Sequence, residues 1–109
     1  MMIDIEKIDA TTIVTPHGDI DSSRSSHLRG TLKPIVDSNA SRIIVDLSDV
    51  AYMDSSGIAT LIEALQICKQ QEKLLYICGL QTTVRSVIEL ARLDTIFLIT
   101  DSREDALVA

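Results

Sequence analysis

The sequence predicts an α/β protein with a four- to five-stranded mixed, mainly parallel sheet and about four helices packed on it. Two runs of apolar residues, 42–47 and 74–78, have the composition of strands that are buried on both faces, which is typical of a parallel sheet. Three other segments carry apolar residues at helical spacing. Strands that alternate with helices require right-handed crossovers, and therefore a mainly parallel sheet.

The length and composition predict a single domain over residues 1–109. With 46% hydrophobic and 24% charged residues, the chain can form a core without metals or disulfides. Its net charge is −6, and it has no Trp, one Phe and two Tyr. It therefore lacks both the positive field and the aromatic rings that nucleic-acid binding uses, which argues against that class of function.

Two strands are expected near the amino terminus. Residues 2–8 alternate apolar and charged side chains, which is the period of a half-buried strand. Residues 12–15 are rich in β-branched side chains and predict a second strand. Because Pro16 has no backbone N–H, this strand should end near it or lie on an edge there.

A first helix is predicted over about residues 23–37. Its apolar face consists of Leu28, Leu32, Ile35 and Val36. Gly30 lowers helix propensity, and Pro34 removes the donor that would bond the carbonyl of Gly30. Because the apolar face continues through the proline, we expect a kinked helix rather than two short ones.

The remaining elements follow the same logic. A helix should begin at Asp54-Ser55-Ser56-Gly57, and its apolar face contains Ile58, Leu61, Ile62, Leu65 and Cys68. A third helix contains Val84, Val87, Ile88 and Ala91, and residues 96–99 predict a short last strand. Ser102-Arg103-Glu104-Asp105 has the form of a capping box and predicts a closing helix.

No segment predicts targeting or membrane insertion. The longest apolar stretch is about a third of the length that spans a bilayer, and the start of the chain is acidic at once. The sequence thus predicts a soluble cytoplasmic protein. Cys68 and Cys78 fit no metal-binding or disulfide pattern, so we expect reduced, buried thiols and neither a metal nor a cofactor.

The segment 45–57 is the main candidate for a functional site. It runs from the carboxyl end of a buried strand to the start of a helix, where ligands and modifications collect in α/β sheets. Free N–H groups of the first helical turn favour negative charge, so a serine hydroxyl here could carry a phosphate. The simpler interpretation is that Asp54 or a serine only caps the helix and Gly57 relieves crowding.

For each of three classes of enzyme, the sequence lacks a residue that the chemistry requires. A nucleophile elbow needs a glycine at Met53 and a later histidine, but His17 and His27 both precede it. No Gly-Lys pair exists for a phosphate-binding loop. A response-regulator receiver would need a lysine after the last strand, where Thr100 stands instead. We therefore expect no catalytic residues and no enzymatic activity.

Other polar residues precede the first helix. A lone histidine such as His17, without a second ligand or a nucleophile, is interpreted as a surface residue. Alternation would project Asp19 and Asp21 to the same side of an extended segment. They form either a solvated turn, in which Asp21 helps to cap the helix, or a polar patch beside Ser55.

The whole chain resembles a STAS domain, specifically an anti-sigma factor antagonist. The resemblance lies in the residues after the third strand, in the segment Gly18-Asp19-Ile20-Asp21, and in the ending around Ser102 to Leu107. The first of these, Met53-Asp54-Ser55-Ser56-Gly57-Ile58, is the most specific.

The resemblance implies a STAS fold and a switch protein. Ser55 would be phosphorylated by an anti-sigma factor that is also a serine kinase, and a serine phosphatase would reverse the modification. The unmodified protein would bind that anti-sigma factor and so release a sigma factor. The expected switch and partner-binding residues are Asp19, Asp21, Asp54, Ser56 and Gly57.

Two other classes of STAS protein remain open. One is a subunit of a large stress-sensing assembly, and the other is a subunit of a lipid-transport ATPase. Sedimentation as a very large particle would favour the first, and cofractionation with membranes would favour the second.

Overall fold

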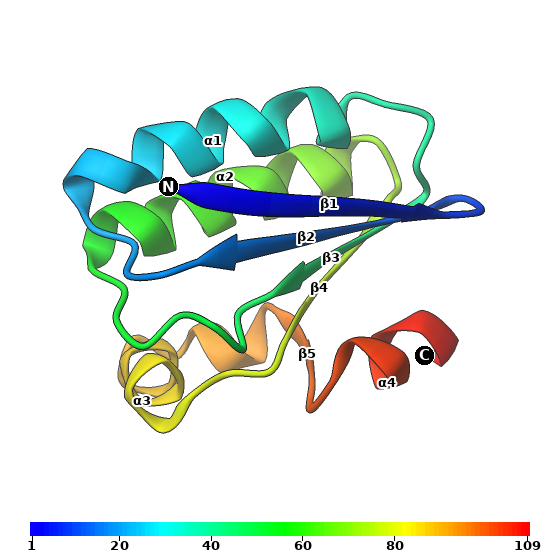
Figure 1. The fold of residues 1–109 in the computed structure, drawn as a ribbon. Helices are drawn as coiled ribbons and strands as arrows, with labels where there is room; N and C mark the ends of the chain where they lie inside the picture. Colours follow the sequence, from blue (N-terminus) through cyan, green and yellow to red (C-terminus); the bar gives the residue numbers. More distant parts are fainter.

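The computed structural model describes residues 1–109 and contains the strands and α-helices in the predicted order (Figure 1). The strands are β1 (Met2–Ile8), β2 (Thr11–His17), β3 (Arg42–Asp46), β4 (Leu74–Cys78) and β5 (Leu98–Thr100). The helices are α1 (Ser22–Val36), α2 (Ser55–Gln70), α3 (Thr82–Leu90) and α4 (Arg103–Val108), with a 3-10 helix, η1 (Leu93–Thr95), before β5.

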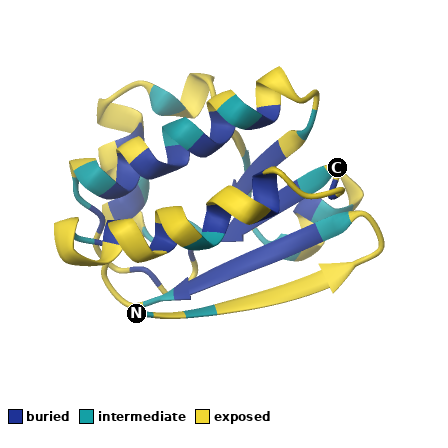
Figure 2. Cartoon of the chain, turned by 90° about the horizontal axis from the view of Figure 1, so that it is seen from above, coloured by how far each residue is buried: buried dark blue, intermediate teal, exposed yellow.

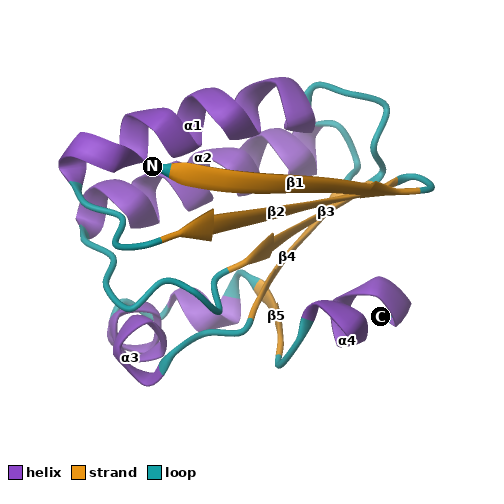
Figure 3. Ribbon diagram, viewed as in Figure 1, coloured by secondary structure: helices purple, strands orange, loops and turns teal.

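The strands form one five-stranded sheet in the order β1-β2-β3-β4-β5 (Figure 3). β1 and β2 are an antiparallel hairpin, and the three other neighbouring pairs are parallel. The predicted mixed, mainly parallel sheet is confirmed. Figure 2 shows that β1 is a largely exposed edge strand, whereas β2 is buried along most of its length.

Pro16 lies inside β2 without disrupting the sheet. β2 pairs with β3 only as far as Val14, so the proline comes after the end of the parallel ladder. On its other side Pro16 lies opposite Ile3 of β1. At Pro16, β2 is therefore unpaired on the side of β3, which confirms the expected edge position. The strand itself continues to His17.

The main core lies between one face of the sheet and the helices α1, α2 and α3. Strand residues of this core are Val14, Ile43, Val45, Leu75 and Ile77, and helix residues include Leu28, Leu32, Leu61, Leu65, Val84 and Ile88. α1 and α2 lie side by side, and α4 lies on the opposite side of the sheet (Figure 1). A smaller core there joins Ile13, Ile44, Tyr76, Cys78 and Ala106.

Helix α1 runs through Pro34 and ends at Val36. The side chains of its predicted apolar face are buried, while Pro34 and Gly30 are exposed. Burial of that face outweighs the cost of the missing backbone hydrogen bond, which explains why the proline does not end the helix. The helix begins at Ser22, one residue before the predicted start.

The last strand differs from the prediction. The apolar run suggested residues 96–99, but β5 comprises Leu98–Thr100, which pair with Tyr76–Cys78 of β4. η1 turns the chain first, and Phe97 then enters the core with only 5% of its surface exposed. Phe97 is therefore apolar because it packs in the core, and the strand begins only at the next residue. β3 likewise ends at Asp46 rather than at residue 47.

Two arginines hold α4 against the sheet. Arg103 Nε donates to Asp46 Oδ2 at 2.8 Å, and its Nη2 donates to Thr15 Oγ1 at 2.7 Å. At the other end of α4, Arg42 donates to the carbonyl oxygens of Ala106 and Leu107. Burial alone would raise the pKa of Asp46, but hydrogen bonds from Ser48 and Arg103 keep that pKa below its usual value.

Both cysteines are free thiols and buried, as predicted. Burial raises the pKa of the Cys78 thiol to about 12 and also raises that of Cys68, which makes both weak nucleophiles. None of the helices combines the length and the apolar character that crossing a membrane requires.

Leu61→Ala should destabilise the protein by about 2–5 kcal/mol, because Leu61 is fully buried between α2 and the sheet. Urea denaturation followed by circular dichroism measures the change in the free energy of unfolding. Leu90→Ala is the matched control: Leu90 is 86% exposed, so its truncation should cost less than about 0.5 kcal/mol. An equally small loss at Leu61 would contradict the assigned core.

Candidate functional site

The candidate site is the start of α2, where the loop after β3 ends. Asp54 is the N-cap residue, with an extended backbone, and Ser55 is the first residue of the helix. Asp54 Oδ1 accepts hydrogen bonds from the backbone N–H groups of Ser56 at 2.9 Å and Gly57 at 3.3 Å. The carboxylate thus satisfies donors that the first turn would otherwise leave free.

The two serines of this turn have different environments. The Ser56 hydroxyl donates to Asp54 Oδ1 at 2.5 Å, so it is part of the cap and is half-buried. Ser55 is exposed, and its hydroxyl makes no hydrogen bond within the protein. Of the two hydroxyls, only that of Ser55 is both accessible and free to react.

Helix α1 begins in the same way. Asp21 Oδ1 accepts from the backbone N–H of Ser23 at 3.0 Å, from its hydroxyl at 2.6 Å, and from Arg24 N–H at 3.2 Å. The tripeptide Asp-Ser-Ser thus starts both helices, at residues 21–23 and 54–56. This repeat is the signal in the sequence for the shared geometry of the two helix starts.

A short parallel bridge brings the two helix starts together. Ile20 pairs with Met53, the Ile20 N–H donates to the Tyr52 carbonyl at 3.0 Å, and the Asp54 N–H donates to the Ile20 carbonyl at 3.1 Å. Ile20 and Met53 are both buried. Asp21 and Asp54, which follow the bridged residues, are therefore neighbours.

Both capping carboxylates are charged at neutral pH. The Ser56 hydroxyl, followed by the backbone N–H groups of the turn, holds the pKa of Asp54 below its usual value, while the nearby Asp21 carboxylate acts in the opposite direction. The pKa of Asp21 is lowered in the same way, chiefly by the Ser23 hydroxyl. Asp21 and Asp54 thus place two neighbouring carboxylates at the start of α2, and Arg24 Nη1 lies 3.4 Å from Asp21 Oδ2.

Gly57 is required by the close approach of α2 to the bridge. A Cβ atom at this position would lie 2.6 Å from Cγ of Met53 and 2.9 Å from Cγ2 of Ile20. Both distances are too short for carbon atoms, and both side chains are buried. The suggestion that Gly57 relieves crowding is therefore correct, and the crowding comes from the bridge.

The loop before Ser55 is also fixed from the side of α3. The Gln81 side-chain amide donates to the Ser48 carbonyl at 2.9 Å, and the Thr83 hydroxyl donates to the Ala51 carbonyl at 2.5 Å. These residues come some 30 positions later in the chain and belong to no local motif, so the sequence around Ser55 gives no signal for them. The loop that leads to Ser55, the first residue of α2, is consequently well supported.

His17 is not the isolated surface residue that its sequence context suggested. Its Nδ1 lies 2.6 Å from Asp49 Oδ2 and its Nε2 lies 2.7 Å from Asp4 Oδ2. The histidine therefore joins β1, the end of β2 and the loop that leads to Ser55. The sequence gives no signal for this cluster, because its three members are distant along the chain.

The residues proposed from sequence are largely brought together. Asp21, Asp54, Ser56 and Gly57 surround the start of α2, whereas Asp19 is exposed and makes no side-chain hydrogen bond. No group of three or more His, Cys, Asp or Glu side chains in the structure could hold a metal ion.

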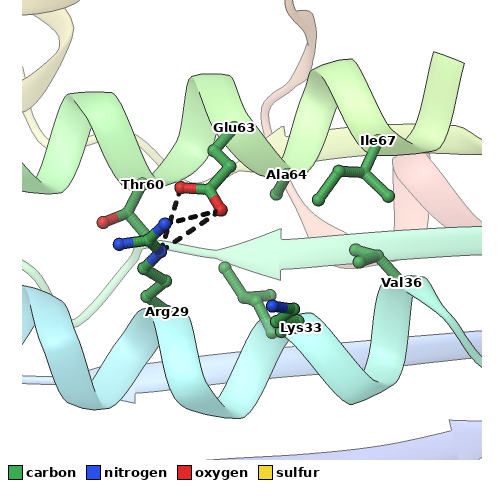
Figure 4. A pocket seen from close by; sticks show the side chains of 8 residues that line it. Arg29, Lys33, Val36, Thr60, Glu63, Ala64 and Ile67 are labelled. Atoms are coloured by element: carbon green, nitrogen blue, oxygen red, sulfur yellow. Dashed lines mark hydrogen bonds and ion pairs between the residues drawn. The ribbon is translucent and has the colours of Figure 1, made fainter. Parts of the chain in front are cut away.

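The groove between α1 and α2 is a weaker candidate for a ligand site. Figure 4 shows Arg29 of α1 reaching across it to Glu63 of α2, where the Arg29 Nε lies 3.0 Å from Glu63 Oε2. The apolar part of the groove, near Leu32 and Ile67, has a free volume of about 10 Å³, which is room for about one water molecule. Nearer the helix starts, an open polar hollow of about 210 Å³ lies between the same helices and is lined by Ser25, Arg29 and Ser56 among others. The enclosed part of the groove is therefore too small for a ligand, and the larger part is an open, polar surface hollow.

Gly57→Ala should destabilise the protein by about 1–3 kcal/mol, because the added methyl group must displace Met53 or Ile20. Gly30→Ala is the matched control, since Gly30 is also helical but has no atom within 4 Å of the new Cβ. It should gain about 0.5–1 kcal/mol from helix propensity. Urea denaturation of both variants measures the difference, and wild-type stability of Gly57→Ala would refute the close contact.

Comparison with known proteins gives consistent results. The sequence model of the STAS domain matches residues 2–106. BtrV of Bordetella bronchiseptica, which is named as an anti-sigma factor antagonist, is 29% identical over 109 residues, covering 100% of this chain and 94% of its own.

Solved structures show the same fold. An anti-sigma factor antagonist from Mycobacterium paratuberculosis superposes with a TM-score of 0.88 at 23% identity, covering 98% of this chain and 91% of its own. The phosphorylated form of the Bacillus cell fate determinant SpoIIAA has a TM-score of 0.74 at 17% identity, covering 95% of this chain and 96% of its own. Since the family match extends over nearly all of the sequence, the chain belongs to the STAS domain family.

Proposed function

We propose that this protein is an anti-sigma factor antagonist whose partner binding is switched by phosphorylation of Ser55. The observation that carries the proposal is the exposed, unbonded Ser55 hydroxyl at the first position of α2, beside the capping carboxylate of Asp54. The names of BtrV and of the Mycobacterium protein support the same class of function.

The partner is an anti-sigma factor that is also a serine kinase. In the modification, Ser55 Oγ forms a bond to the γ-phosphorus of ATP, the bond to the β-phosphate oxygen breaks, and ADP leaves. The hydroxyl proton passes to a base of the kinase. The start of α2 tolerates the product because the helix dipole favours negative charge there, although Asp54 already accepts from the N–H groups of Ser56 and Gly57.

The phosphate would disfavour the complex rather than the fold. It adds about −1.5 to −2 charges and three acceptor oxygens to a surface that already carries Asp21 and Asp54. Because the loop is fixed by the bridge and by α3, it cannot easily move the new group away from the partner. A penalty of about 3 kcal/mol corresponds to a more than hundredfold loss of affinity.

In this proposal the protein acts as a cytoplasmic regulator and not as an enzyme. The unphosphorylated form binds the anti-sigma factor and so releases a sigma factor. Phosphorylation ends that binding, and a serine phosphatase restores it.

The partner class is tested by a pull-down from the native cytosol, with identification of the captured proteins by mass spectrometry. We expect an anti-sigma factor with a serine kinase domain. Sedimentation of the protein in a megadalton particle would instead indicate a stress-sensing assembly, and cofractionation with membranes would indicate a lipid-transport ATPase. Either result, without the kinase, would contradict the proposed partner.

Ser55→Ala should retain binding to the captured kinase but take up no phosphate. Ser55→Asp should bind more weakly than wild type, though less weakly than the phosphorylated protein, because a carboxylate has less charge and bulk than a phosphate. Binding is measured by calorimetry, and phosphate uptake by incubation with the kinase and ATP followed by peptide mapping.

Ser56→Ala and Ser22→Ala are the matched controls for this experiment. Ser56 belongs to the same turn, and Ser22 holds the equivalent position at the start of α1. Both variants should still be phosphorylated on Ser55. Phosphate on Ser56 or Ser22 in the wild-type protein, or none on Ser55 with an active kinase, would refute the assignment.

A further inference from the structure

We propose that His17 is a positioning residue that, as an imidazolium, clamps the loop of residues 47–54 to the β1–β2 hairpin. Deprotonation of His17 then loosens this loop, which leads to Ser55. The clamp is the cluster of His17, Asp4 and Asp49. Its existence follows from the geometry alone, and only its consequence for Ser55 rests on the proposed function.

The two short contacts determine the charge of the ring. Nε2 lies 2.7 Å from a carboxylate oxygen of Asp4, and Nδ1 lies 2.6 Å from one of Asp49. A carboxylate can only accept, and a neutral imidazole has a single N–H to donate. One of the two contacts would then place a nitrogen lone pair against a carboxylate oxygen. Both contacts are hydrogen bonds only if the ring carries two protons.

The clamp joins segments that are distant along the chain. Asp4 belongs to β1, His17 ends β2, and Asp49 lies in the loop between β3 and α2. The adjacent Gly18 N–H also donates to the Asp49 carbonyl at 3.0 Å, in a left-handed conformation with φ of 94°. Asp49 is therefore held through both its side chain and its backbone at the point where the hairpin meets the loop.

The clamp holds a part of the loop that the contacts from α3 and from the bridge do not reach. Gln81 and Thr83 bond Ser48 and Ala51 from the α3 side, and the Ile20–Met53 bridge fixes the end of the loop. Asp49 is bonded instead from the end of β2, by the His17 ring to its side chain and by the Gly18 N–H to its carbonyl. Loss of the clamp would free this side of the loop five residues before Asp54 while leaving the helix cap intact.

Protonation can control the clamp because the ring is accessible. His17 is 32% exposed, and Asp4 and Asp49, the two charged groups that contact it, are 69% and 64% exposed. Hydrogen bonds to Asp49 and then to Asp4 raise the pKa of His17 above 6.5, its ordinary value. The clamp is thus complete below that ordinary pKa and is lost as the pH rises through the higher pKa of the folded protein.

The state of the ring is tested by NMR of the ¹⁵N-labelled protein without any partner. At pH 6 both ring nitrogens of His17 should have the shifts of protonated nitrogens, and the ring should lose its proton only at a pH above 6.5. A His17 ring that is neutral at pH 6, or that titrates at or below pH 6.5, would overturn the proposal.

The effect on the loop is tested by amide hydrogen exchange, expressed as protection factors at each pH. Protection of the Gly18 amide should fall about tenfold as His17 deprotonates, and His17→Gln should show the lower protection at every pH. His17→Lys keeps the positive charge and should retain protection without the pH dependence. His27→Gln is the control and should behave as wild type.

The same pH dependence of Gly18 protection in wild type and His17→Gln would refute the clamp. Because these measurements need neither a kinase nor an anti-sigma factor, they stand even if the proposed function fails. The consequence for Ser55 is tested separately, by incubating wild type, His17→Lys and His17→Gln with the kinase at several pH values. The rate of Ser55 phosphorylation in wild type should change with pH beyond the pH dependence of the kinase itself. The rate in His17→Lys should follow the pH dependence of the kinase alone.

Discussion

The site depends on the pairing of two residues, Ile20 and Met53, outside the main sheet. This bridge ties the end of the loop before α1 to the end of the loop before α2, so that two helices start next to each other. It also explains why Gly57 has no side chain, since the first turn of α2 passes directly over the bridged pair. Without the pairing, Asp21 would lie on a separate loop and the acidic surface beside Ser55 would not form.

Much of the fold could be predicted because burial imposes a period on the sequence. The apolar face of α2 and the doubly buried strands β3 and β4 each follow such a period, and all were located within a residue or two. The last strand was displaced because Phe97 is apolar for a different reason, namely burial in the main core shortly after η1. A short apolar run does not distinguish a strand from a buried turn.

The candidate site was predicted less completely than the fold. The cap at Asp54 is a local motif, and its residues are consecutive in the sequence. The contacts of Gln81, Thr83 and His17 depend on three-dimensional neighbours that no local spacing encodes. His17 is instructive, because its neighbours Pro16 and Gly18 suggested only a turn. Its role depends on two aspartates from other segments.

The exposed position of β1 has a consequence for solubility. An edge strand offers unpaired backbone groups that can recruit a strand from another molecule and start aggregation. Here Asp4, Glu6 and Lys7 place charges along that edge, and such charges oppose pairing with a second copy. Asp4 therefore has two roles. It contacts His17, which holds the loop that leads to Ser55, and its charge opposes the pairing of β1 with a strand of another molecule.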